Sequence, residues 1–344
     1  MNSFEIFFTK ITLAENEIQQ VFYFLIMLAT IFKMTRPVNI VIAVVTLFIG
    51  YFLQGAITFG ASDIPLYSLI LQAFGFAFAI GFGNIQNDVL DFESDKLNRP
   101  ERPLPSGRIS VGAAKTAWIV MAILTVMCGI TDGILSGAYA TPSLFFAALV
   151  LLLIAYNKKL KHIPLLKNMT VAFLCATPLI LNLLYTVIVI DKTTIAFSSR
   201  LGSLYPAMLF AFLLTTAREI YKDLEDEIGD LKAGIMTFPL IAGATTARRF
   251  AGALAIFCWA LLPLPVMQGY FSKWFLIVAA ATLTPTLGAA IISAHQKNYH
   301  RAQGLIKVAM FLGLIALVVS TIVDPHFIVI SKATYTQVKP TLVY

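Results

Sequence analysis

The chain carries little charge for its length. Asp, Glu, Lys and Arg make up 12% of its 344 residues, whereas 58% of the residues are hydrophobic and the mean hydropathy is +0.82. Soluble domains carry about 25% charged residues. The composition therefore excludes an ordinary soluble domain and predicts a chain that lies in a lipid bilayer.

Cysteine and histidine are also scarce. Cys128, Cys175 and Cys258 each stand alone in an apolar segment, so neither a disulfide framework nor a CxxC metal site is available. The four histidines show no ligand spacing, which argues against zinc or iron. The net charge of +7 includes no basic run with interleaved aromatics, so we expect no nucleic-acid partner, and no segment indicates an obligate protein partner.

Long apolar runs recur along the whole chain. Each is near the roughly 20 residues that a helix needs to cross the hydrocarbon layer, and the alternation typical of a β-barrel is absent. We predict an all-α, multi-pass bundle of nine transmembrane helices, over residues 38–56, 65–84, 111–130, 141–157, 168–190, 203–217, 248–269, 274–294 and 304–323.

The first 34 residues form an N-terminal extension. They lack the order of basic, apolar and small residues that marks a removable signal peptide, and Phe22 to Phe32 is apolar but short. We expect an interfacial helix there. It would lead into a transmembrane domain over 35–323, which a C-terminal tail over 324–344 follows.

The basic residues predict the orientation. The segment before the first span and the loops after spans two, four, six and eight hold every Lys and Arg except Lys192, Arg200, Lys273, Lys332 and Lys339. Cytoplasmic loops are enriched in Lys and Arg. We therefore expect a cell-membrane protein whose N-terminus is cytoplasmic and whose C-terminus lies outside.

Two loops on the predicted cytoplasmic side contain matched aspartate triplets with spacing i, i+3, i+7. The triplets are Asp88, Asp91 and Asp95 after the second span, and Asp223, Asp226 and Asp230 after the sixth. On a helix this spacing aligns three carboxylates on one face, where they repel each other. If these aspartates only formed a solvated rim, the same unfavourable charge repulsion would not be expected to occur twice with identical spacing. We interpret the triplets as cation sites in cytoplasmic cap loops, within an internal duplication of a four-helix unit.

The residue types indicate which cation and substrate are bound. Carboxylate oxygens suit Mg²⁺, which is commonly shared with substrate phosphates. Arg102 follows the first triplet and Lys222 precedes the second. Two such clusters with basic residues around them form a clamp for a diphosphate leaving group. At the mouth of an apolar bundle, an isoprenyl diphosphate fits both the clamp and the hydrocarbon interior.

Both loops resemble motifs of the UbiA superfamily of intramembrane prenyltransferases. Asn87 completes an NDxxDxxxD motif with the first triplet, and Lys222 completes a KDxxDxxxD motif with the second. The two motifs in their extended form, with the first continuing to Arg108 and the second beginning at Arg218, most resemble the digeranylgeranylglyceryl phosphate synthase group, although chlorophyll synthases share much of the first motif. The resemblance covers residues 33–323. It implies transfer of a geranylgeranyl group from its diphosphate to a lipophilic acceptor, geranylgeranylglyceryl phosphate, in ether-lipid synthesis.

The resemblance also implies roles for individual residues. Two Mg²⁺ ions, for which Mn²⁺ can substitute, would be bound by Asp88, Asp91 and Asp95 and by Asp223, Asp226 and Asp230. Diphosphate binding would fall to Arg102, Lys222 and either Lys159 or Lys161, with Asn84 and Asn87 assisting. Tyr156 would lie near the reacting carbon.

Several alternatives stay open at this stage. Arg36 and Asn39 begin the first span and could face the acceptor pocket, but Arg36 could equally be a topogenic residue at the membrane surface. The diphosphate motifs are shared by enzymes that prenylate an aromatic quinone precursor, such as a naphthoate or a benzoate, or a chlorophyll-like acceptor. A transporter is a more distant alternative, because transporter sites usually lie at the membrane midplane.

If both triplets serve one substrate, their loops must lie side by side, with Asp91 facing Asp226. We expect partly helical loops, with the prolines of residues 100–105 ending the first helix and starting a lid that excludes water. Gly229 and Gly234 would bend the second loop. We also expect the aspartates to lie in a wet mouth, where they contribute little to helix packing.

The interpretation of the triplets predicts a metal requirement. Activity should need Mg²⁺ or Mn²⁺, and a chelator should remove it reversibly, because hard oxygen sites exchange their metal. The measurement is turnover of a labelled isoprenyl diphosphate before chelation, after chelation and after metal is restored. Full turnover after exhaustive chelation would contradict the prediction.

Overall fold

The computed structural model describes residues 3–54, 57–58, 61–62, 64–185, 203–232 and 234–323. The predicted tail over 324–344, the end of the fifth predicted span and four of the five outward basic residues lie outside these ranges. Within them all regular secondary structure is helical except for one two-stranded antiparallel hairpin, in which Ile57 pairs with Ser62 and Thr58 with Ala61.

The elements follow the predicted spans closely. The first half contains α1 (Ser3–Met34), α2 (Pro37–Leu53), β1 (Ile57–Thr58), β2 (Ala61–Ser62), α3 (Leu66–Leu90), α4 (Phe92–Asn98), α5 (Val111–Ser136), α6 (Ala140–Lys158) and a short 3₁₀ turn (Leu160–His162). The second half contains α7 (Leu166–Tyr185), α9 (Leu204–Glu225), α10 (Glu227–Lys232), α11 (Phe238–Ala242), α12 (Ala244–Ala260), α13 (Leu264–Met267), α14 (Lys273–His295) and α15 (Tyr299–Val323).

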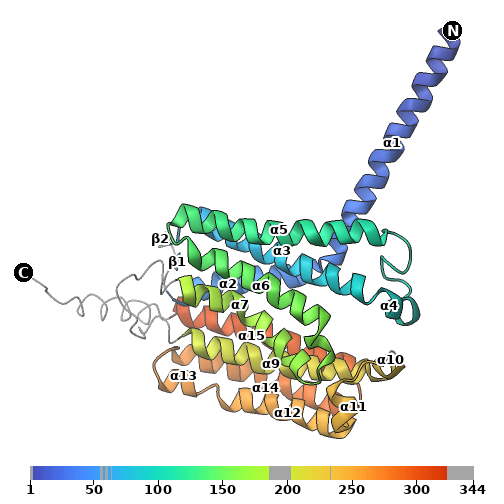
Figure 1. Ribbon diagram of the computed structural model, residues 1–344. Helices are drawn as coiled ribbons and strands as arrows, with labels where there is room; N and C mark the ends of the chain where they lie inside the picture. The colour runs from blue at the N-terminus through green and yellow to red at the C-terminus, as the bar shows by residue number, and fades with distance from the viewer. Residues whose placement is uncertain are drawn as a thin grey trace, which may run out of the picture.

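The long helices from α2 to α15 form one bundle and run roughly along a common axis (Figure 1). In the first half α3 packs against α2, α5 and α6, and in the second half α9 packs against α7, α12 and α15. Contacts of α2 with α7 and with α15 join the halves. The short helices α4 and α10 lie at the same end of the bundle, which we call the mouth (Figure 1).

Length and apolar composition support membrane insertion of the described helices. Seven of them are long and apolar enough to cross a bilayer, or eight if residues 19–34 and α2, which are bent by 56°, form one broken span. The chain is therefore a multi-pass integral membrane protein. The predicted number of nine spans is not established by this criterion.

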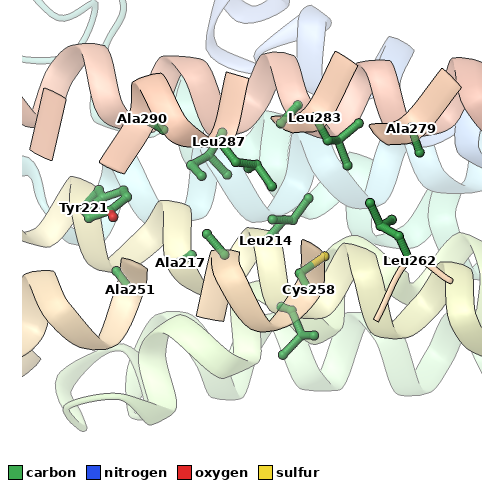
Figure 2. Close-up of a cluster of buried hydrophobic side chains, with 14 of the residues drawn as sticks. Leu214, Ala217, Tyr221, Ala251, Cys258, Leu262, Ala279, Leu283, Leu287 and Ala290 are labelled. Carbon is green, nitrogen blue, oxygen red and sulfur yellow. The ribbon is translucent and has the colours of Figure 1, made fainter. Parts of the chain in front are cut away.

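Small side chains let the helices of the second half approach closely. Ala251 of α12, Ala279 and Ala290 of α14 and Ala217 of α9 are all fully buried, and Figure 2 shows them among leucines, Tyr221 and Cys258 in one continuous core. Close packing of small residues is the usual way in which helices associate where water supplies no hydrophobic driving force.

Two expectations about the loops and the N-terminus need correction. The helix at the N-terminus is longer than the predicted Phe22–Phe32 segment, and it projects from the bundle as α1 (Figure 1). Gly229 lies inside α10 and does not bend the second loop. Gly234 does turn the chain, with a φ of +68° that favours glycine.

Glycine packing in the first half generates a stability prediction. A Cβ at Gly75 would lie 2.5 Å from Cζ of Phe146, whose side chain is fully buried. Gly75→Ala should therefore destabilise the protein in detergent by about 1–3 kcal/mol through overpacking. Thermal unfolding measures this. Gly288→Ala is the matched control, because a Cβ there meets open space, and an equal loss in both variants would contradict the packing explanation.

Candidate active site

Both aspartate triplets lie where a long helix bends into a short one. Asp91 joins α3 to α4 with φ −90° and ψ 7°, and Asp226 joins α9 to α10 with φ −85° and ψ 0°. The helical hydrogen bonds continue through each bend, since each middle aspartate donates its N–H to the carbonyl four residues earlier at 2.9 Å. The prediction of partly helical loops is confirmed, and each helix bends at the middle aspartate.

Basic side chains from other elements neutralise the first triplet. Arg36, which precedes α2, lies 3.2 Å from Asp88, and Arg102 lies 2.6 Å from Asp95. Lys161, in the turn after α6, donates to Asp91 at 2.6 Å, and the Asn87 amide donates to the other oxygen of Asp91 at 2.8 Å. Three separate segments therefore hold the first triplet in position.

The second triplet has fewer partners. Lys167 and Asn168, in the first turn of α7, donate to the two oxygens of Asp223 at 2.6 and 2.8 Å. Asp223 is 1% exposed, so these contacts are largely shielded from water. Asp230 forms no ion pair within the described ranges, and its buried Oδ2 atom has no hydrogen-bond partner there. Burial raises the pKa of the Asp230 carboxyl to about 6, although Lys167 opposes the shift.

An ion pair joins the two loops. Arg99, which follows α4 in the first loop, lies 2.9 Å from Oδ1 of Asp226 in the second. The contact links residues 127 positions apart in the chain. The predicted apposition of the loops is therefore confirmed. The helix before Arg99 ends at Asn98, two residues before the first of the three prolines.

A cavity of about 760 Å³ opens between the two loops and continues into the bundle. Its mouth is lined by charged side chains that include Asp91, Asp226, Lys161 and Lys222. Its deeper walls are apolar and come from both halves, with Phe76 and Leu149 on one side and Phe210, Phe275 and Leu283 on the other. The shape suits a molecule with an anionic head and a hydrocarbon tail.

Most of the predicted site residues line this cavity. They are Arg36, Asn39, Asn84, Asn87, Asp91, Asp95, Arg102, Tyr156, Lys161, Lys222, Asp226 and Asp230. Asp88 and Asp223 do not line it, because they are buried behind their basic partners. Lys159 is exposed and lies outside the cavity wall, so the geometry favours Lys161 over Lys159 at the mouth.

The burial of Asp88 and Asp223 corrects the expectation of a wet mouth. Their side chains are paired inside the protein and contribute to its packing. Four neighbouring residues were not among the predicted site residues, namely Lys167, Asn168, Arg218 and Glu219. The last two lie just before the KDxxDxxxD motif, which is the signal that could have identified them, whereas the first two, at the start of α7, have no such signal.

The described residues contain no group of three or more carboxylate, histidine or cysteine side chains close enough to form a complete metal cage. This arrangement fits Mg²⁺, which is usually bound by one or two carboxylates together with water and substrate phosphates. The unpartnered Oδ2 of Asp230 and the cavity-facing Asp91 and Asp226 are the oxygens that could serve as such ligands. The residues present therefore fit a magnesium ion that is shared with substrate.

Comparison with known proteins identifies the protein family to which the chain belongs. The model of the UbiA prenyltransferase family matches residues 43–315, so the chain belongs to this family of prenyltransferases. The digeranylgeranylglyceryl phosphate synthase of Methanobrevibacter smithii is 31% identical over 84% of this chain and 96% of its own length.

Solved structures share the fold. One concerned with a digeranylgeranylglyceryl phosphate synthase has a TM-score of 0.64 at 24% identity and covers 86% of this chain and 99% of its own. A UbiA homologue from Archaeoglobus fulgidus bound to GPP and Mg²⁺ has a TM-score of 0.51 at 19% identity and covers 89% and 99%.

The pairing of Asp223 with Lys167 predicts a separation of stability from activity. Asp223→Ala leaves the Lys167 ammonium, whose side chain is 20% exposed, without its partner and should destabilise the protein by about 3–5 kcal/mol. Asp223→Ala combined with Lys167→Met should recover most of that loss and stay inactive. Unfolding in detergent and turnover are the two measurements, and a double variant no more stable than the single would refute the pairing.

Proposed function

We propose that the chain transfers a geranylgeranyl group from its diphosphate to geranylgeranylglyceryl phosphate and depends on Mg²⁺. The observation that carries this proposal is the joining of two aspartate triplets over one cavity with a charged mouth and apolar depths. The names of the similar enzymes support the acceptor.

Binding of the diphosphate falls to the basic side chains at the mouth. Three bases of the cavity wall each form an ion pair with an aspartate, namely Lys161, Arg102 and Arg99. A short movement of each side chain would bring it to phosphate oxygens. Arginine suits bidentate phosphate contacts and lysine acts as a point charge. Lys222 makes no salt bridge within the described ranges and would contact the diphosphate directly.

We propose two metal ions, one on each triplet, with Asp91 and Asp95 on the first and Asp226 and Asp230 on the second. Bound Mg²⁺ would neutralise the charge that develops on the departing diphosphate, and Mn²⁺ can replace it. Asp88 and Asp223 would position the basic residues beside these ligands and reach the metal only if those ion pairs open. The structure of the relative with GPP and Mg²⁺ supports the use of the metal.

The chain's own residues would complete the reaction. As the allylic C–O bond breaks, Tyr156 presents an aromatic ring from the wall of the cavity, where it can stabilise the positive charge on the allyl group. The segment from Arg99 to Ile109 would exclude water, which would otherwise compete with the acceptor. The diphosphate leaves with the electron pair of the broken bond, the acceptor oxygen forms the new C–O bond, and the hydroxyl proton passes to an oxygen of the released diphosphate.

We infer nine membrane spans, from two copies of a four-helix unit and a ninth helix, α15. Residues with positive φ, Arg36 and Leu165, directly precede the first helix of each unit. An asparagine occupies the third position of both helices, at Asn39 in α2 and Asn168 in α7. In each unit a base near that helix start pairs with the first aspartate of the triplet, as Arg36 does in the first and Lys167 in the second. These parallels support an internal duplication.

We also propose that the mouth and the N-terminus face the cytoplasm of a cell-membrane protein whose C-terminus lies outside. The excess of Lys and Arg in the segments at the mouth supports this orientation. The projecting α1, with exposed Phe22, Phe24 and Phe32, suits an interfacial helix at the same side of the membrane.

Product analysis tests the proposed reaction. Purified protein, Mg²⁺ and labelled geranylgeranyl diphosphate should give a digeranylgeranylglyceryl phosphate when geranylgeranylglyceryl phosphate is supplied, as identified by mass. Asp91→Ala or Asp226→Ala should lower turnover by at least about 100-fold, the scale of losing one electrostatic catalytic contact. A product formed only with a naphthoate, a benzoate or a chlorophyll-like acceptor would overturn the assignment.

A further inference from the structure

One lysine of the cavity wall lies outside both aspartate motifs and has no carboxylate partner among the described residues. Lys307 lies on α15 and lines the cavity, and it makes no salt bridge or hydrogen bond in the part of the chain that the structure describes. The other lysines and arginines of the wall, apart from Lys222, are already paired with carboxylates, as Arg36, Lys161 and Lys167 illustrate. Lys307 is therefore free to bind an anion other than the diphosphate.

The position of Lys307 on α15 argues against the interpretation that its side chain only extends to the membrane surface. The cavity-lining residues of α15 include Gln303, Lys307, Met310, Leu314 and Leu317. Their spacing of three or four residues defines one face of a helix. Lys307 lies on that face. A lysine whose only role was to extend its ammonium group to the membrane surface would have no reason to lie on the face that lines the cavity.

Two contacts between α15 and α9 show how far Lys307 lies from the mouth of the cavity. Gln303 of α15 donates to Glu225 of α9 at 2.6 Å, and farther along α15 Met310 lies 3.8 Å from the hydroxyl of Thr215. Lys307 lies on the stretch between these contacts. It therefore runs alongside the part of α9 that carries Lys222 and the second triplet's first aspartate, level with the diphosphate end of the cavity.

We propose that Lys307 binds the phosphate monoester of the acceptor and so selects a phosphorylated lipid alcohol. This inference rests on the proposed function. A glyceryl phosphate has only three carbons, so its free hydroxyl and its phosphate lie close together. When the hydroxyl reaches the reacting carbon, the phosphate must enter the same charged chamber as the diphosphate, and it needs a cation of its own.

The proposal predicts a defect confined to one substrate. Lys307→Met should raise the KM for geranylgeranylglyceryl phosphate about 10- to 100-fold, the usual effect of losing one hydrogen bond to a charged group. The KM for geranylgeranyl diphosphate should not change. For geranylgeranylglycerol, which lacks the phosphate, wild type and variant should behave alike, and Lys307→Arg should restore much of the loss.

Lys115→Met is the matched control, because Lys115 is exposed on α5 and lies outside the cavity wall. Equilibrium binding of labelled geranylgeranylglyceryl phosphate to metal-free protein gives a readout that does not need turnover. The dissociation constant should rise by the same factor in Lys307→Met and stay constant in Lys115→Met. Retained elution as a single species in size-exclusion chromatography shows that each variant is folded.

The outcomes separate two kinds of failure. If the wild-type protein uses the phosphorylated acceptor and Lys307→Met leaves its KM unchanged, or raises the KM of the diphosphate instead, the role of Lys307 is wrong and the proposed function stands. If the wild-type protein transfers no prenyl group to any phosphorylated acceptor, the proposed function is wrong and the role of Lys307 falls with it.

Discussion

An unpaired charge is costly at the edge of a hydrocarbon layer, and most charges at the mouth of this bundle are paired accordingly. Every aspartate of the two triplets except Asp230 lies against a base, and each base comes from a different segment from the aspartate's own long helix. The ion pairs therefore fix the relative positions of α2, α3, α7 and α9 at the mouth, and they define the walls of the cavity below.

The helical architecture and the triplets could be predicted from the sequence because both are local patterns. An apolar run of sufficient length predicts a helix wherever it occurs, and α14 (Lys273–His295) differs from its predicted range of 274–294 by one residue at each end. The triplets were found because their spacing is fixed by helical geometry. Apposition of the loops followed from chemistry, since one diphosphate needs both clusters.

The partners of the aspartates could not be predicted because they depend on the tertiary fold. Lys167 is 56 residues away from Asp223, and nothing in the surrounding sequence distinguishes it from the nearby Lys158 or Lys159. Burial was missed for the same reason, since the expectation of a wet mouth treated both motifs as loops. Asp223 in fact lies on the last turns of α9, where neighbouring helices cover it.

The pairing of Lys161 with Asp91 has a thermodynamic consequence. In the proposed reaction Lys161 would move from the carboxylate to a phosphate, so a cation that took its place on Asp91 would also release it for the diphosphate. The ion pairs of Arg99 with Asp226 and of Arg102 with Asp95 would open in the same way. Linkage then requires that metal and diphosphate raise each other's affinity by an equal factor. The mouth would thus be a cooperative binding unit, in which neither ligand reaches its full affinity alone.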